Sequence, residues 1–370
     1  MQFTVNQNLF LQALAKVSSV VPQRSTIPAL NNVLLELKGS ELTLSATDLE
    51  ISLSTKIVVQ SEQDGQAMML ARKLYEIIRE LPDVDVNITI NEERRMEISC
   101  DRGKYYLSGD EVEDFPLLPS IEEGKGKEVT LNADKTKRMV GKTLFAVSKD
   151  ELQPALTGIL LELRPKEARC VATDGYRLVK IIDKAFRYDG EQESFIVPQK
   201  AMNLLLRFLE DEKELKLKFD PNHLIFQLGS TDLTTRLIEG KYPRYEAAIP
   251  SSSKNVLKVD LEILRSSVRR ASIFADSLSR QIRFKISGNA MEIMAEDIEV
   301  GGSAKENLEV DYQGEELQVG YNANYVLDAL KHLDTEEIVF ELGAAGTPGV
   351  MKPVEQEPDE DFMMLVMPIR

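Results

Sequence analysis

The sequence contains little cysteine or histidine. Its 370 residues include two cysteines, Cys100 and Cys170, and two histidines, His223 and His332. A disulfide framework needs more cysteines, and a histidine-based metal site usually needs more ligands than these separated residues offer. We therefore expect no metal and no cofactor, and we interpret both cysteines as small core residues of a protein in a reducing cytoplasm.

Long apolar runs and a secretion signal are also missing. No apolar run approaches the roughly 18 residues of a membrane span, and the first six residues lack the basic stretch of a signal peptide. The 29% charged and 43% hydrophobic residues are an ordinary globular composition. These features predict a soluble, cytoplasmic protein with no membrane partner.

The sequence shows no recognisable catalytic motif. Residues 124–127 (Gly-Lys-Gly-Lys) lack the spacing of a phosphate-binding loop, and there is no Gly-x-Ser-x-Gly segment. Three recurring aspartates, Asp48, Asp174 and Asp297, leave a hydrolase as an alternative. The first two follow Ala-Thr directly after a predicted strand, where such side chains commonly cap a turn. We therefore expect no catalytic residues and no enzyme activity.

The chain repeats one unit three times. Residues 28–37 match residues 154–163 at an offset of 126, and Ala46–Asp48 matches Ala172–Asp174 at the same offset. A more diverged copy follows at a further offset of 123, where residues 282–286 lead to Ala-Glu-Asp at 295–297. We assign the repeats to residues 1–122, 129–250 and 256–370, separated by segments rich in Gly, Ser, Lys and Glu.

Each repeat has two helical patterns among alternating strand patterns, which predicts an α+β domain of two helices packed on antiparallel strands. The predicted helices are residues 6–18, 71–81, 133–149, 199–209, 260–275 and 322–333. Strands are predicted around the alternating apolar residues of 42–53, 86–100 and 215–228.

Charge differs between the helices and the rest of the chain. The net charge is −16, yet the predicted helices hold 15 of the 45 Lys and Arg and only 6 of the 61 Asp and Glu. Basic helices on an acidic body suit contact with the phosphates of a nucleic acid from one side, without base readout. Alternatively, the basic residues pair with neighbouring carboxylates. Both interpretations stay open at this stage.

Four segments give the chain a marked resemblance to the bacterial DNA polymerase III β subunits, the replicative sliding clamps. They are Val171–Leu178, Gly240–Pro243, Asn322–Asp328 and Val366–Arg370, and the resemblance covers all 370 residues. It implies three repeated clamp-type domains, a ring-forming head-to-tail homodimer around duplex DNA, and a processivity role without sequence specificity. A monomeric peptide-binding scaffold is the alternative.

The resemblance also implies a pocket for short linear peptides from the polymerase III catalytic subunit, the clamp loader, and other polymerases or repair proteins. Its wall would comprise Leu156, Thr173, Gly175, Tyr176, Arg177, Leu178, Pro243, Asn322, Tyr325, Leu365, Met367, Pro368, Ile369 and Arg370. In this set, the apolar side chains would receive the peptide's anchors and Tyr176, Asn322 and Tyr325 would offer polar groups.

Two further residue sets follow from the resemblance. At the dimer interface, Tyr105 and Leu107 would meet Ile273 and Phe274, and Arg102 and Lys104 would face acidic residues such as Glu299. The candidate DNA contacts are Arg24, Arg72, Lys73, Lys135, Lys137, Arg138, Lys142, Lys200, Arg265, Arg269 and Arg270.

Overall fold

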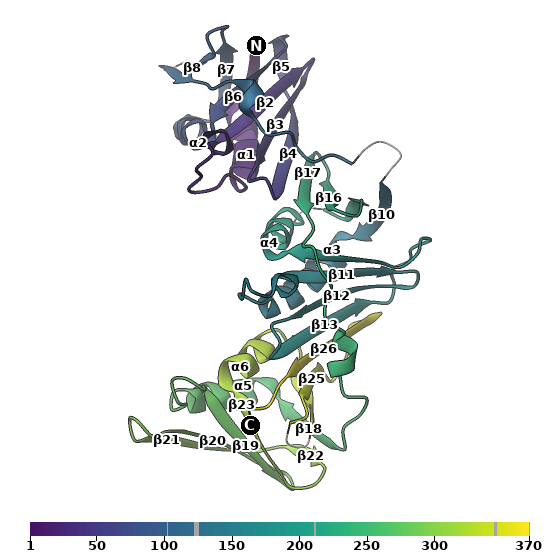
Figure 1. Ribbon diagram of the computed structural model, residues 1–370. Coiled ribbons are helices and arrows are strands. Elements are labelled where there is room, and N and C mark those ends of the chain that lie inside the picture. Colours follow the sequence, from purple (N-terminus) through teal and green to yellow (C-terminus); the bar gives the residue numbers. More distant parts are fainter. Residues whose placement is uncertain (102, 122–125, 211, 344–345, 370) are drawn as a thin grey trace. The chain divides into compact units, whose positions relative to one another are not determined.

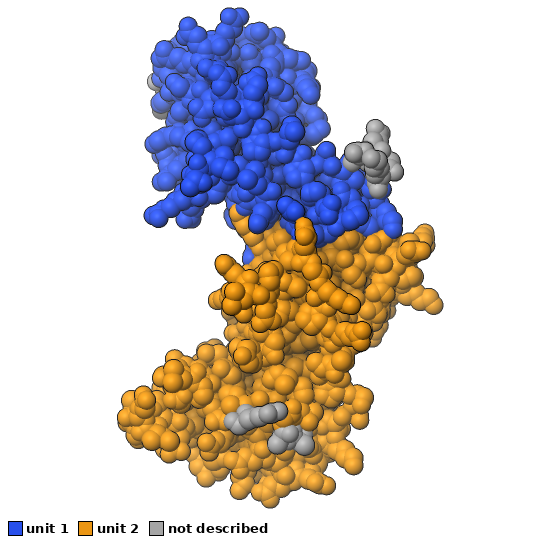
Figure 2. All heavy atoms as spheres, viewed as in Figure 1, with its two compact units in different colours: residues 1–134, 203–237 blue, residues 135–202, 238–370 orange. Residues whose placement is uncertain are grey.

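The computed structural model describes residues 1–101, 103–121, 126–210, 212–343 and 346–369. The chain forms two compact units (Figure 2). Unit 1 comprises residues 1–134 and 203–237, and unit 2 comprises residues 135–202 and 238–370. The first predicted repeat thus lies in unit 1, the third lies in unit 2, and the second contributes chain to both. The exact repeat boundaries stay a prediction.

The described chain is α+β, and its strand pairings are antiparallel, as the sequence predicts (Figure 1). The helices are α1 (Gln7–Ser18), α2 (Ala71–Glu80), α3 (Ala133–Thr143), α4 (Gln199–Phe208), α5 (Leu261–Ser272) and α6 (Ala323–Lys331). Helix α1 packs on α2, and α5 packs on α6.

The strands form four sheets within the described residues. Sheet A has the order β5 (Gln60–Gln63), β1 (Gln2–Asn6), β7 (Asp85–Ile90), β8 (Arg95–Cys100), β9 (Gly103–Ser108). Sheet B has the order β10 (Lys127–Asn132), β15 (Glu214–Phe219), β16 (His223–Leu228), β17 (Thr231–Arg236), β4 (Ile51–Val58), β3 (Glu41–Thr47), β2 (Asn32–Lys38), β6 (Gly65–Leu70). Sheet C has the order β14 (Glu193–Pro198), β11 (Gly158–Arg164), β12 (Glu167–Thr173), β13 (Arg177–Asp183), β26 (Glu360–Val366), β25 (Gly349–Pro353), β24 (Glu337–Leu342), β18 (Asn255–Asp260), β22 (Asp311–Gln313). Sheet D has the order β21 (Gly302–Glu309), β20 (Ala290–Asp297), β19 (Gln281–Ser287), β23 (Leu317–Asn322).

Apolar spacing and side-chain caps explain the helices. In α1, Phe10, Leu14 and Val17 are buried on one stripe, and the Asn6 side chain accepts hydrogen bonds from the first backbone N–H groups. Asp260 caps α5 in the same way. Repeats one and three therefore begin a helix with the same local chemistry.

Two predicted helices are too long. The predicted helix 133–149 ends at Thr143, whose hydroxyl donates to the carbonyls of Met139 and Val140. A short 3₁₀ turn follows, and the Ser148 N–H then bonds the Leu156 carbonyl, so Lys149 lies outside the helix. The predicted helix 260–275 ends at Ser272, and Ile273 is its C-cap.

The recurring Ala-Thr-Asp segment is a capped turn, as predicted. Asp48 Oδ1 accepts hydrogen bonds from the Glu50 and Ile51 amides, and Asp174 Oδ1 does the same for Tyr176 and Arg177. In the third repeat, Asp297 accepts from two amides as well. These carboxylates hold turns between strands, so they do not favour the hydrolase alternative.

Two strand pairings join the repeats side by side. The first junction is the pairing of β4 with β17 in unit 1, and the second junction is the pairing of β13 with β26 in unit 2. At the first junction, the last strand of the meander β2–β3–β4 pairs with the last strand of the meander β15–β16–β17. At the second junction, the corresponding meanders are β11–β12–β13 and β24–β25–β26. In the third repeat, the strand that corresponds to β4 and β13 is β21, which lies at the end of sheet D. In the first repeat, the strand that corresponds to β17 and β26 is β9, which lies at the end of sheet A. Within the described residues, no strand continues either sheet beyond them.

The cysteines differ in burial. Cys170 is buried in β12, and burial raises the pKa of its thiol to about 12. Cys100 lies at the end of β8 and is only partly buried, so its assignment to the core was wrong.

Candidate functional site

The second junction brings together residues that are distant in the sequence. Register in the β13–β26 pair sets Leu178 opposite Leu365. Beyond β26, the Met367 N–H donates to the Tyr176 carbonyl and the Ile369 N–H donates to the Gly320 carbonyl, each at 2.8 Å. The C-terminal segment is therefore fixed against the start of β13 and against β23.

An apolar cluster covers this junction. Its buried members are Leu160, Val171, Leu178, Ile196, Tyr245, Val350, Met363 and Leu365, and Ala155, Ile238, Tyr242, Ile249 and Met367 pack on them partly buried. Three residues of the predicted pocket, Leu178, Leu365 and Met367, belong to it. Leu156 is buried nearby in a 3₁₀ turn, and Pro243 is exposed in the segment that leads to Tyr245.

Tyr245, which sequence reasoning missed, anchors one wall of the cluster. Its hydroxyl donates to Glu162 Oε2 at 2.7 Å and accepts from Arg169 at 3.1 Å. Burial, followed by the Glu162 carboxylate, raises the pKa of the Tyr245 phenol. A signal was present in the sequence, because Tyr245 follows the Gly-Lys-Tyr-Pro segment by two residues.

Arg177 links three elements at the edge of the cluster. Its guanidinium donates to Asp174, to Asp328 of α6 and to the Phe145 carbonyl. It also lies over the rings of Phe145 and Tyr325, at 5.2 and 4.9 Å from their centroids. Arg177 is thus committed to internal contacts, and it holds the Asp174 turn against α6.

The aromatic pair Tyr176 and Tyr325 lies beside this arginine. Their rings stack with centroids 6.2 Å apart, and Tyr176 is 63% exposed. Thr173 and Gly175 form the turn that presents Tyr176, since the Gly175 N–H bonds the Thr173 hydroxyl and Gly175 has a φ of 88°, which favours glycine. These residues supply an exposed aromatic surface next to the apolar cluster.

The remaining predicted pocket residues differ in role. The Asn322 side chain caps α6 by accepting from the Asn324 amide and donates to the Ser279 carbonyl, so it is not a free polar group for a ligand. Pro368 and Ile369 are partly buried in the C-terminal segment. Arg370 lies outside the described residues.

Most candidate DNA contacts form ion pairs within the protein. Arg72 and Lys73 share Glu76, Arg265 contacts Glu262, Arg270 contacts Glu306, and Lys135 contacts Asp183. Arg138 binds Glu360 and Asp334, and the Glu360 hydrogen bond raises the pKa of this arginine. These pairs match the alternative interpretation of the helical charge.

The structure argues against Lys142 as a DNA contact. Lys142 is 8% exposed, and its ammonium donates to Asp334 and to the His332 carbonyl. In contrast, Arg24 and Arg269 are exposed, Lys200 is exposed on α4, and Lys137 is partly buried on α3. Exposed cations are the ones that can meet phosphate.

The predicted interface residues lie at the two sheet ends. Tyr105 and Leu107 belong to β9, with Tyr105 40% exposed. Ile273 is 75% exposed and Phe274 is 40% exposed just after α5, while Glu299 is exposed in the turn before β21. Lys104 contacts Glu97 of the neighbouring strand. Arg102 lies outside the described residues.

Metal-ligating clusters and membrane-spanning helices are absent from the described parts of the chain. There, no three His, Cys, Asp or Glu side chains are grouped so that they could hold a metal ion. None of the helices described is both long and apolar enough to cross a membrane.

Comparison with known proteins places the whole chain in one family. Family profiles described as the N-terminal, central and C-terminal domains of the DNA polymerase III beta subunit match residues 1–119, 130–244 and 246–370. The chain is 32% identical to the beta sliding clamp of Pseudomonas aeruginosa and 29% identical to that of Vibrio cholerae, with 100% of this chain and of each relative covered.

Solved structures agree with this assignment. The DnaN sliding clamp of Pseudomonas aeruginosa bound to griselimycin superposes with a TM-score of 0.93 at 31% identity, covering 100% of this chain and 99% of that one. The Bacillus subtilis sliding clamp gives a TM-score of 0.93 at 26% identity, with 100% and 99% covered. The chain therefore belongs to the DNA polymerase III beta subunit family, the sliding clamps that act as non-catalytic processivity subunits of the replicative polymerase.

Proposed function

We propose that two copies of this chain close head to tail into a ring around duplex DNA. The observation that carries the proposal is the pair of unused sheet ends, β9 and β21. Their counterparts pair within the chain at both junctions, as β17 with β4 and β26 with β13. Pairing β9 of one copy with β21 of another would repeat this contact and cover both of these edges.

Exposed apolar residues near these ends support the same contact. Tyr106 on β9 is 50% exposed, and Ile298 and Val300, just before β21, are 86% and 78% exposed. Ile273 adds a further exposed apolar side chain. An edge strand flanked by apolar side chains suits burial against another protein surface.

Inside the ring, basic helix residues would meet DNA phosphates. Arg24, Lys137, Lys200 and Arg269 are our main candidates, and surface pairs such as Arg72 with Glu76 can exchange a carboxylate for a phosphate at small cost. The acidic remainder of a chain with a net charge of −16 would repel DNA elsewhere. Such contacts are independent of base sequence.

The second-junction cluster would bind short peptides from partner proteins. Met367 and its apolar neighbours offer an adaptable surface for aliphatic or aromatic anchors, and Tyr176 with Tyr325 offers an exposed aromatic rim. The partners would be the polymerase III catalytic subunit, the clamp loader, and other polymerases or repair proteins. Action on chromosomal DNA would place the protein in the cytoplasm.

Retention on DNA of two topologies tests the ring. After loading by the clamp-loader complex, the protein should remain on closed circular DNA in high salt and should leave linear DNA of the same sequence, because salt screens charges and does not open a ring. Equal loss from both would count against encirclement.

Sedimentation at micromolar concentration should give a molecular mass of twice 41.6 kDa. A monomeric mass would favour a peptide-binding scaffold instead.

A further inference from the structure

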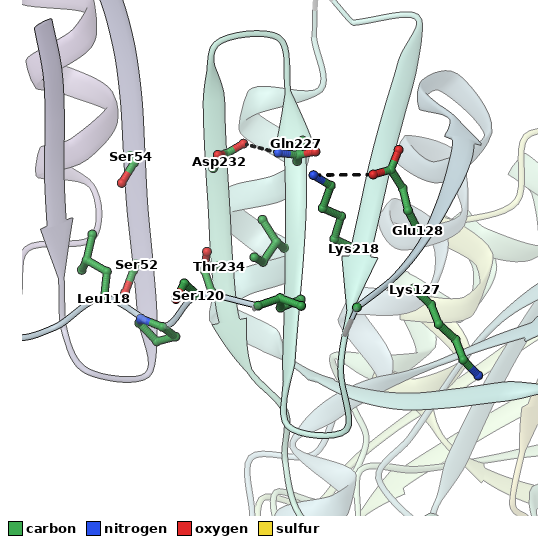
Figure 3. Close-up of a pocket in the computed structure, with 14 residues that line it drawn as sticks. Ser52, Ser54, Leu118, Ser120, Lys127, Glu128, Lys218, Gln227, Asp232 and Thr234 are labelled. Carbon is green, nitrogen blue, oxygen red and sulfur yellow. Dashed lines mark hydrogen bonds and ion pairs between the residues drawn. The ribbon is translucent and has the colours of Figure 1, made fainter. Parts of the chain in front are cut away.

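The first junction carries a cavity of about 410 Å³ at the place where the second junction carries its apolar cluster. The floor is the face of sheet B around β4 and β17, and the segment Leu118–Ile121 forms a wall (Figure 3). All of these residues belong to unit 1.

The repeat relates this cavity to the second-junction cluster position by position. Ser52 pairs with Thr234 across the first junction, as Leu178 pairs with Leu365 across the second. Ser54 and Asp232 are the next outward pair, and their counterparts are Lys180 and Met363. The backbone of the two sites is equivalent, but Ser52, Thr234 and Asp232 stand where the second junction has Leu178, Leu365 and Met363.

The apolar part of the first junction ends where these polar residues begin. Leu34, Met68 and Phe115 form a small buried cluster on which Leu118 packs. Leu34 corresponds to Leu160 in the second junction, where the cluster continues through Val171, Leu178 and Leu365. Ser45 stands at the position of Val171. The cavity floor beyond it is formed largely by polar side chains, namely Ser52, Ser54, Gln227, Asp232 and Thr234.

The polar groups of the floor have acceptor capacity left over. The Ser52 hydroxyl donates to Thr47 Oγ1, whose own proton goes to the Ile51 carbonyl, so Ser52 offers only lone pairs. Gln227 Nε2 donates to Asp232 Oδ1 at 3.2 Å, leaving Gln227 Oε1 and Asp232 Oδ2 to accept (Figure 3). A ligand that donates hydrogen bonds can therefore bond Ser52, Gln227 and Asp232 together.

Two carboxylates, Asp232 and Glu128, and two ammonium groups, Lys127 and Lys218, line the cavity, and Asp232 is the charged group beside the Ser52–Thr234 pair. Asp232 has no ion pair within 4.0 Å among the described residues, and Lys56, which it influences electrostatically, is held by Glu41. Lys218 at the far end of the cavity is paired with Glu128 (Figure 3). A half-buried carboxylate with neighbouring acceptors is complementary to a group that combines positive charge with several N–H donors.

We propose that this cavity binds the guanidinium of an arginine in an extended segment of a partner protein, with Asp232 as its counter-ion and Ser52 and Gln227 as further acceptors. Arginine fits better than lysine because its planar fork can address a carboxylate and a neighbouring acceptor together. The site is separate from the apolar cluster, and it does not depend on what that cluster binds.

Titration of a short peptide tests the proposal. The probe is acetyl-Gly-Arg-Gly-amide, and its control is the same peptide with citrulline, which keeps the shape but has no charge. Binding to the full-length protein is measured by saturation-transfer difference NMR. We expect Asp232→Asn and the citrulline probe each to weaken binding about tenfold, the size of a lost charged hydrogen bond.

Asp311→Asn is the matched variant, because it removes an exposed carboxylate on β22 and causes the same change in net charge. It should bind the arginine probe as the unmodified protein does. Equal binding of the two probes, or unchanged binding to Asp232→Asn, would overturn the proposal. The probe comparison uses the unmodified protein, so it holds even if a variant folds poorly. A protein lacking residues 367–370 should still bind the arginine probe, which separates this site from the peptide pocket.

Discussion

The first and second junctions share a backbone and differ in side chains. Both pair the end of one meander with the end of another, yet Ser52 and Thr234 occupy the first where Leu178 and Leu365 occupy the second. The second also has the Arg177 cross-link, whereas its counterpart in the first repeat is the buried Ile51. Strand pairing therefore gives the two junctions the same backbone, and a few outward side chains give them different chemistry.

The largest difference between the two junctions should be in peptide affinity after the C-terminal segment is removed. Deleting residues 367–370 takes away Met367 and the bonds to Tyr176 and Gly320, so affinity for a labelled peptide from the polymerase catalytic subunit should fall by about 100-fold or more. Fluorescence anisotropy measures the loss, and sedimentation should still show a dimer. Leu117→Ala, an exposed leucine near the first junction, should leave affinity unchanged. Equal binding by the deletion variant would refute the pocket assignment.

Arg177→Met should destabilise the second junction alone. It leaves Asp174 and Asp328 without their cation, which we expect to cost about 2 to 3 kcal/mol, less than for a fully buried pair because Asp328 is partly exposed. Denaturant unfolding measures the change. Arg283→Met, an exposed arginine on β19, should change stability by less than about 0.5 kcal/mol. Similar effects of the two substitutions would mean that the cross-link contributes nothing.

Tyr245→Phe tests the hydrogen bonds that anchor Tyr245 to Glu162 and Arg169 beside the apolar cluster. Losing the hydroxyl leaves Glu162 and Arg169 with one partner fewer, so stability should drop by about 1 to 2 kcal/mol and peptide affinity should weaken a few-fold. Its counterpart at the first junction, Leu118, has no such anchor. Tyr75→Phe is the control, and stability that falls equally in both variants would contradict a specific role.

The smallest effect should be a pH dependence located at the second junction. His332 stacks on Phe145 with ring centroids 3.8 Å apart, and burial lowers its pKa, helped by Lys142 and Lys331 and opposed by Asp328. The unfolded chain then binds the proton more readily, so stability is complete above the unfolded pKa, near 6.5, and falls as pH drops towards the folded value.

Unfolding by denaturant at pH 7.5 and 5.5 measures how the free energy of unfolding depends on pH. His332→Phe should flatten this dependence while preserving a ring on Phe145. A slope that survives in His332→Phe would assign the pH dependence to other groups.

Local pattern predicted much of the fold. The offset of 126 between the first two repeats and the alternating residues of β7, β8, β15 and β16 were sufficient to identify the repeated α+β units. The capped Ala-Thr-Asp turns also followed from the sequence, because a short side chain bonds backbone amides within its own turn.

Contacts between distant segments could not be predicted in this way. The charge of Lys142 suggested a surface residue, but its partner Asp334 lies 192 residues away. Asn322 resembled a polar group for a ligand, and the structure uses it as a helix cap. Tyr245 was missed because it begins a 3₁₀ turn that is too short to show a periodic pattern. Its partners Glu162 and Arg169 become visible only once sheet C is formed.

The β13–β26 pairing also has a consequence for biosynthesis. Strand β26 lies between β13 and β25 in sheet C, yet it leaves the ribosome about 180 residues after β13. At about 5 to 20 residues per second, β13 therefore waits roughly 10 to 35 s with an uncovered hydrogen-bonding edge. During that interval the nascent chain presents a template for wrong strand pairing. Strand β4 waits about as long for β17, so we expect chaperone contact during translation at both strands.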